Sequence, residues 1–422
     1  MRRSSTRIDE REGAIDDARI LKEIDDGEVA ALCADLARIP SFSGEEGPCA
    51  RFLAGRLREL GFDEVSLQDV EPGRPNVIAV LKGDGGGPSF MFNGHLDIDP
   101  LPADYAAPHW RPVVADGKLY GLGVGNMKAG DAAMVMAATA LRRSGLPLKG
   151  DVIVAGVVGE LQGGIGTRHM LERGLVPDLA IVPEPTACNV RTIHAGVLEL
   201  LIHFSGRTAW IGNRDILDHV DAIAMAAKGV EALGGVRFRH TPRADLPGLP
   251  AMVVGGIIGG LTPDYVVWRP AMVADYCTIE VDVRLAPGMT LESTVADLRA
   301  ALDAVAVNDP DFRYEIDLPP APYRKPFQAM GLFMPPNDLP PGHRLAQVCR
   351  DWHRRLSGTE PGVGVFIPGS YAGADSGHLA AFGTKCLNYG PSDHSRFYNE
   401  CDLDKLALAT RVLALAAAEF VL

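Results

Sequence analysis

Hydrophobic and polar positions follow two different periods in the first part of the chain. Residues 28–39 and 50–60 carry apolar side chains at helical spacing, which predicts two amphipathic helices, and an alanine-rich segment at 131–141 predicts a third. Short apolar runs bounded by glycine or proline predict buried strands at 76–81, 89–93, 151–158 and 179–182. Strands that alternate with helices favour the α/β class with a mainly parallel central sheet.

The pattern changes from about residue 195. Two further strands and two helices predict a smaller α+β domain, with the strands at 197–204 and 276–285 and the helices at 222–233 and 291–305. The α/β pattern then returns and continues to a C-terminal helix at 404–420. We therefore expect one large domain from residues 1–194 and 317–422, interrupted by an inserted domain at 195–316.

Composition and charge narrow the classes of partner and compartment. The chain has 422 residues and a formal net charge of −13, which disfavours nucleic acid or an anionic membrane because both need a cationic face. The longest apolar run, residues 251–261, is shorter than the roughly 20 residues of a membrane-spanning helix. Seven scattered cysteines without a CxxC pair predict reduced thiols. These features predict a cytoplasmic protein.

Polar side chains of the metal-ligand type follow several of the predicted strands. His95 and Asp97 end one strand, and Glu160 and Glu184 follow the next two, while a glycine-rich turn presents Asn126. That turn fits neither the dinucleotide-binding nor the Walker spacing. Each residue alone has a structural explanation, as a core histidine, a solvated carboxylate or a turn asparagine. Together they indicate a site, because ligands bind beyond the carboxyl ends of strands in α/β sheets.

The order of short motifs along the chain carries a family resemblance. GHLD, GxGxxxMKxG, a Glu before xxGGxGT, EPT, and GP followed by NE occur in sequence, with a D-x-R strand at 282–284. In these motifs nearly the whole chain resembles the di-zinc aminoacylase, carboxypeptidase G and succinyl-diaminopimelate desuccinylase family. The resemblance implies a zinc-peptidase-like catalytic domain, an inserted lid or dimerisation domain, and a homodimer or larger homo-oligomer.

Four residues match the family's functional positions. By resemblance, His95 and Glu184 are ligands of the same metal, Glu160 is the general base, and Asp97 is the carboxylate that orients the site. Three other positions depart from the family pattern: Asn126 replaces the bridging aspartate, Leu161 replaces the second glutamate, and Arg396 replaces the late ligand histidine.

The family binds two metals. These departures remove both ligands that bind only one of them, and they leave in place the ligands that bind only the other. The sequence therefore predicts a single divalent transition metal held by His95, Glu184 and the amide oxygen of Asn126. Mixed nitrogen and oxygen ligands are compatible with manganese or zinc first, and with iron or cobalt as alternatives. His394, two residues from Arg396, is a substitute ligand only if its loop shifts.

The lid and the late loops offer candidate substrate contacts. The family's lid histidine, which polarises the substrate carbonyl, aligns with Trp210, and its partner asparagine aligns with Ala271. A small carboxylated substrate is expected to meet arginine side chains and an aromatic face. The candidate substrate-binding residues are Arg396, Arg284, Trp210, Asp375 and His378.

Loss of the lid histidine disfavours ordinary amide hydrolysis, because one such donor is worth about 10²–10³ in rate. The leading hypothesis is a single-metal hydrolase that deaminates an amino-aromatic acid with Glu160 as base, as in the family's nitroanthranilate aminohydrolase branch. One alternative is an N-acyl-amino-acid or dipeptide amidohydrolase in which His194, His219 or His378 supplies the lost imidazole. The other is a non-catalytic homologue that binds a ligand.

Overall fold

The larger domain is built around an eight-stranded sheet. The computed structural model describes residues 15–99, 111–213, 215–267, 270–318, 332–393 and 399–422. The strand order is β1-β2-β6-β3-β7-β17-β8-β16, and the centre from β6 to β17 is parallel. The strands are β1 (Glu64–Glu71), β2 (Arg74–Leu81), β3 (Phe90–His95), β6 (Val152–Val157), β7 (Leu179–Val182), β8 (Val190–Arg191), β16 (Val363–Gly364) and β17 (Lys385–Asn388).

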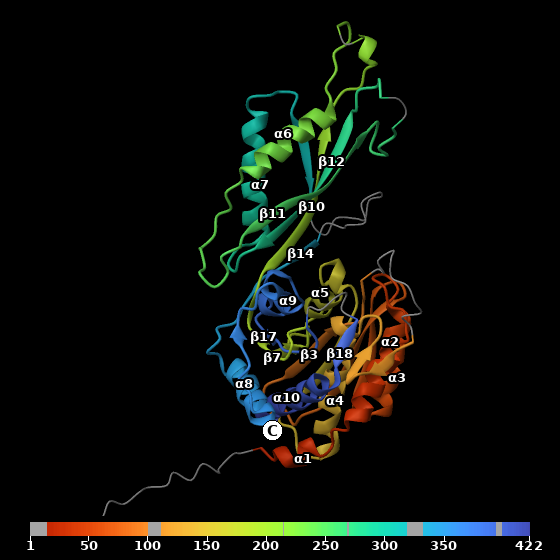
Figure 1. Ribbon diagram of the computed structural model, residues 1–422, viewed down its shortest axis with the longest axis vertical. Helices are drawn as coiled ribbons and strands as arrows, with labels where there is room; N and C mark the ends of the chain where they lie inside the picture. Colours follow the sequence, from red (N-terminus) through yellow and green to blue (C-terminus); the bar gives the residue numbers. More distant parts are fainter. Residues whose placement is uncertain (1–14, 100–110, 214, 268–269, 319–331, 394–398) are drawn as a thin grey trace, which may run out of the picture.

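Helices cover both faces of this sheet (Figure 1). Alternate residues of one strand serve the two faces: Val77 and Ala79 of β2 join one core, whereas Ile78 and Val80 join the other. The first core contains α1 (Asp17–Leu21), α2 (Asp26–Ala37), α3 (Gly47–Glu59), α4 (Ala129–Ser144), α8 (Arg344–Ser357) and α10 (Leu403–Val421). The second contains α5 (Ile165–Glu172) and α9 (Ser376–Ala381). This layered arrangement confirms the predicted α/β class.

The inserted domain, here called the lid, has its own sheet and core. Antiparallel strands lie in the order β11-β12-β10-β13, and α6 (Ala222–Gly234) and α7 (Leu291–Ala306) contribute to the lid core. Figure 1 shows the lid beyond the strand ends of the larger domain. The lid strands are β10 (Gly196–Ser205), β11 (Ala251–Gly260), β12 (Tyr276–Leu285) and β13 (Arg313–Asp317).

The returning segment takes part in the lid sheet, which the expected boundary at residue 316 did not include. Strand β14 (Leu332–Met334) pairs antiparallel with β10 although it follows the inserted domain in sequence. The amphipathic helix α8 was also absent from the sequence expectations, although its buried positions Leu345, Cys349 and Trp352 follow helical spacing.

Small strands complete the structure. Strands β4 (Val113–Ala115), β5 (Lys118–Tyr120) and β18 (Glu400–Asp402) form one sheet, and β9 (Ile193–His194) pairs with β15 (Asn337–Asp338). All seven cysteines, each within the described ranges, are buried and free. Among the helices that the structure describes, none combines the length and apolar character needed to cross a membrane.

Candidate metal centre and substrate pocket

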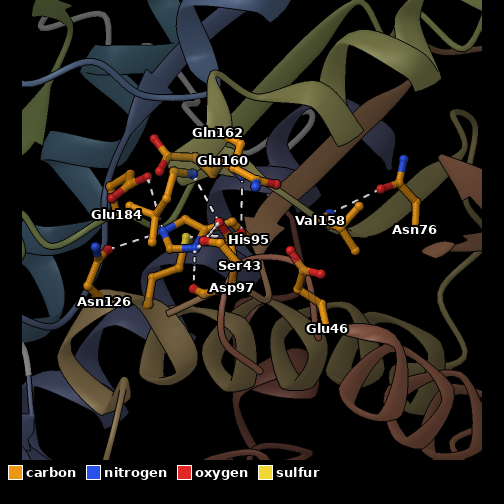
Figure 2. A network of polar contacts seen from close by, with 12 residues as sticks. Ser43, Glu46, Asn76, His95, Asp97, Asn126, Val158, Glu160, Gln162 and Glu184 are labelled. Carbon is orange, nitrogen blue, oxygen red and sulfur yellow. Dashed lines mark hydrogen bonds and ion pairs between the residues drawn. The ribbon is translucent and has the colours of Figure 1, made fainter. Parts of the chain in front are cut away.

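Three parallel strands bring the predicted ligands and base to one edge of the sheet. His95 is the last residue of β3, Glu160 follows β6 in a short 3₁₀ turn, and Glu184 follows β7. Because β3 pairs in parallel with both β6 and β7, the carboxyl ends of all three strands lie together. Figure 2 shows these side chains around the His95 ring.

The His95 ring is oriented by a backbone carbonyl. Its Nδ1 lies 2.9 Å from the carbonyl oxygen of Asp97, and because a carbonyl only accepts, Nδ1 carries a hydrogen. The other nitrogen, Nε2, lies 3.2 Å from Asn126 Oδ1 and 3.9 Å from Glu184 Oε1. His95, Asn126 and Glu184 therefore converge on one point (Figure 2).

The Asp97 carboxylate holds the turn that carries Glu160. Its Oδ1 accepts a hydrogen bond from the backbone N–H of Glu160 at 3.1 Å, and its Oδ2 accepts from Leu161 N–H at 3.0 Å and from the Ser43 hydroxyl at 3.1 Å. Its side chain is fully buried. Asp97 thus orients the imidazole through its carbonyl and positions Glu160 through its carboxylate.

Buried carboxylates surround the imidazole. Burial alone would lower the pKa of His95, but the nearby carboxylates of Glu160, Asp97, Glu184 and Asp131 raise it to about 10. Burial raises the pKa of Glu160 well above its usual value. Several carboxyl groups are thus buried around one imidazole, and a divalent cation is the counter-charge that would let them ionise together.

The donor set is chemically suited to a divalent ion. Glu184 Oε1 is buried and has no hydrogen-bond partner in the described part of the chain, which leaves this oxygen available as a ligand. Within the described ranges, no group of three or more His, Cys, Asp or Glu side chains is arranged to hold a metal. An imidazole, a carboxylate and an amide oxygen are thus the donors that converge here.

A pocket of about 310 Å³ joins this centre to the lid, a size suited to a small ligand. The larger domain contributes Glu160, Glu184 and Asn126. Leu161 lines the same pocket with an apolar side chain. The other described lining residues are Asp99, Pro185, Arg191, Val197, Glu199, Arg284, Leu332, Met334, Ala372 and Gly373.

Three charged lining residues, Asp99, Arg191 and Glu199, were not predicted from the sequence. Arg191 is buried and donates a hydrogen bond to the Gly369 carbonyl at 2.8 Å. Glu199 interrupts the apolar residues 197–202 of β10. A charge inside a buried strand was the available signal for Glu199, whereas nothing in the sequence marks Arg191.

The predicted substrate contacts separate into different places. Arg284 lines the pocket, but its guanidinium already donates to Asp282, at 2.9 Å and 2.7 Å. His378 is buried and hydrogen-bonds the Gly163 carbonyl at 2.8 Å. Asp375 and Trp210 are likewise not among the described residues lining the pocket: Asp375 is buried, and Trp210 is 51% exposed on the lid. Arg396 and His394 lie outside the described residues.

Asp375 and His378 support the turn that follows Glu160. A Cβ at Gly164 would lie 2.6 Å from Asp375 Oδ1 and 2.6 Å from His378 Cδ2. Both side chains therefore pack directly behind the glycine turn that follows Glu160, instead of facing the cavity.

Comparison with known proteins decides the family. The model of peptidase family M20/M25/M40 matches residues 91–419. The chain belongs to this family. As an M20 protein it is a metal-dependent hydrolase acting on C–N bonds, which confirms the predicted enzyme class.

Individual M20 relatives differ in substrate. The chain is 26% identical over 81% of its length and 81% of the relative to N-formyl-4-amino-5-aminomethyl-2-methylpyrimidine deformylase of Bacillus subtilis. It is 30% identical to succinyl-diaminopimelate desuccinylase of Methylorubrum extorquens, over 69% of this chain and 76% of that one. A dinuclear metal-binding M20 peptidase of Bacillus subtilis has a similar fold, with a TM-score of 0.64 at 15% identity over 93% and 97% of the two chains.

The converging donors predict the metal content. We expect one divalent ion per wild-type chain, none in His95→Ala, and one in Glu160→Gln, because Glu160 is assigned as the base and not as a ligand. Elemental analysis of purified protein measures all three. His240→Ala is a matched control, since that imidazole is exposed and bonds only the Phe238 carbonyl among described partners. Two ions per wild-type chain would contradict the donor assignment.

Gly164 tests whether the glycine turn positions Glu160. At a φ of +68°, Gly164→Ala combines an unfavourable backbone conformation with contacts to Asp375 and His378, so we expect at least a tenfold loss of kcat with metal content retained. Gly174→Ala is the control, because Gly174 has a φ of +92° and open space around it. Equal kcat losses in the two variants would show that the packing behind the turn is unimportant.

Proposed function

We propose that this M20 chain is a single-metal hydrolase that cleaves a C–N bond in a small substrate. Its ligands are His95, Glu184 and the Asn126 amide oxygen, and Glu160 is the base. The observation that carries this proposal is Leu161, which lines the pocket beside Glu160 with a side chain that cannot bind a metal. A second ion would lack a carboxylate at this position.

The residues of the pocket have distinct tasks in this proposal. A bound divalent ion supplies Lewis acidity that lowers the pKa of water. Glu160, held by the hydrogen bond from its N–H to Asp97, accepts the proton of the attacking water and returns it to the leaving nitrogen. Arg191 places a guanidinium in the wall, suited to a substrate carboxylate.

The leading specific reaction is hydrolytic deamination of an amino-aromatic acid, of the 5-nitroanthranilate type. Water adds to the ring carbon, the C–N bond breaks, and ammonia leaves. Support comes from the positions of three histidines, one of which an amidohydrolase would need as an oxyanion donor. His194 contacts the Ala195 carbonyl and the Ser376 hydroxyl, at 2.8 Å and 2.7 Å. His194, His219 and His378 are all absent from the described pocket lining.

Amide hydrolysis is the second candidate, and the relatives favour it. Both the deformylase and the desuccinylase named above are named for removing an acyl group from nitrogen. In this reaction the same Glu160 would activate water for attack on a carbonyl, and an amine and an acid would be released.

A substrate panel distinguishes the two reactions. Metal-loaded enzyme is incubated with 5-nitroanthranilate, an N-formyl aminomethylpyrimidine, N-succinyl-diaminopimelate and N-acetyl amino acids, and ammonia and free amine are measured. We expect ammonia from the nitroaminobenzoate without acyl cleavage, and a loss of about 10²–10⁴ in rate in Glu160→Gln. Acyl cleavage alone would replace the leading reaction by the second.

We further propose that the lid forms a homodimer. Strand β11 is an edge of the lid sheet, and its Val253 and Ile257 are 56% and 54% exposed. An exposed apolar edge strand favours pairing with another chain. A second copy would continue the sheet and cover these side chains.

Light scattering tests the dimer. We expect twice the chain mass of 45.0 kDa for the wild type and a single chain mass for Ile257→Lys, because a charge on an edge strand opposes pairing. Val307→Lys is the control: Val307 is 83% exposed and follows the last residue of α7, so it is not part of the edge strand. A wild-type mass of 45.0 kDa would refute the proposal.

A further inference from the structure

One acidic side chain of the lid reaches the substrate pocket. Glu199 is the partly exposed residue of β10 between buried neighbours from Gly196 to Phe204. Its register partner on β12 is Asp282, and Val197 pairs with Arg284 on the same face. Glu199, Val197 and Arg284 all line the pocket. This face of the lid sheet is therefore the pocket wall opposite the metal centre.

The carboxylate of Glu199 is not neutralised by this wall. Arg284, on the same face of β12, makes two hydrogen bonds to Asp282, so its charge is already shared. Burial and the Asp282 carboxylate raise the pKa of Glu199 to about 7, although Arg284 acts in the opposite direction. Glu199 also shares a side-chain hydrogen bond with Asp282, so the described residues of this wall include two carboxyl groups and one guanidinium.

The larger domain contributes a cation to the same pocket. Arg191 comes from β8 of the catalytic domain and lines the same cavity. The pocket thus presents a guanidinium on one wall, a carboxyl group on the lid, and the His95 centre where the C–N bond is cleaved. The half-buried Glu199 carboxyl shares one hydrogen bond with Asp282 and has further acceptor positions for an N–H group of a ligand.

We propose that Glu199 is a specificity-determining residue that binds a second, non-scissile nitrogen of the substrate, an ammonium or a ring amino group. The proposal rests on the proposed function in one respect, that the scissile nitrogen lies at the His95 end. The substrate class is then a small ring acid with two nitrogen substituents, one lost in the reaction and one held by the lid.

Paired ligands test this without requiring turnover. Anthranilate and its 3-, 4- and 5-amino derivatives are titrated calorimetrically into metal-loaded protein. We expect at least one diamino isomer to bind the wild type about tenfold or more tightly than anthranilate, as a charge-assisted hydrogen bond allows. In Glu199→Leu this ratio should fall to about one, while anthranilate affinity stays within about threefold. Leucine suits the site because Val197, Leu332 and Met334 also line it.

Two further variants keep the result interpretable. Glu280→Gln is the matched control, because Glu280 lies on the same strand as Asp282 but not among the described lining residues, and it should keep the wild-type ratio. Glu199→Gln replaces the leucine variant if that protein does not fold, and it should lower the ratio. Retention of the ratio in the Glu199 variants, or no preference in the wild type, would overturn the inference. A Glu199-dependent preference without turnover of any panel substrate would instead overturn the proposed function alone.

Discussion

The arrangement of the site depends on the hydrogen bonds of one buried residue, Asp97. Its carbonyl directs the His95 ring, and its carboxylate accepts the backbone N–H groups of Glu160 and Leu161. These contacts fix the position of the turn after β6 relative to the end of β3. A side chain with fewer acceptor sites would release the turn that carries Glu160, because the N–H groups of Glu160 and Leu161 bond the two carboxylate oxygens of Asp97.

Electrostatic balance explains why the altered residues occur together. In the family pattern, the positions of Asn126 and Leu161 hold carboxylates, so both changes remove negative charge next to His95. The remaining carboxylates still raise the pKa of His95 against the effect of its burial. One dication neutralises such a set, whereas two would repel each other without an anionic bridge. The substitutions are thus mutually consistent with one ion.

Much of the fold could be predicted because its strands are short, apolar and bounded by glycine or proline. The site followed from the same signal, since His95, Glu160 and Glu184 stand directly after such strands. Side-chain direction could not be predicted: Asp375 and His378 were expected to bind the substrate, yet they pack behind Gly164. Arg191 also needed the structure, because its approach to the pocket depends on the pairing of β8 with β16 across a long sequence separation.

Strand β14 has a mechanical consequence for the pocket. It is covalently part of the segment returning to the catalytic domain, but its hydrogen bonds attach it to β10. The apolar wall formed by Leu332 and Met334 therefore travels with the lid in any hinge rotation. Leu332 also packs against Gly163, where an added Cβ would lie 2.8 Å from the Leu332 Cβ. An outward rotation of the lid would break the contact between Leu332 and Gly163 and remove this support from the glycine turn. Closure of the lid and alignment of Glu160 would then occur in one movement.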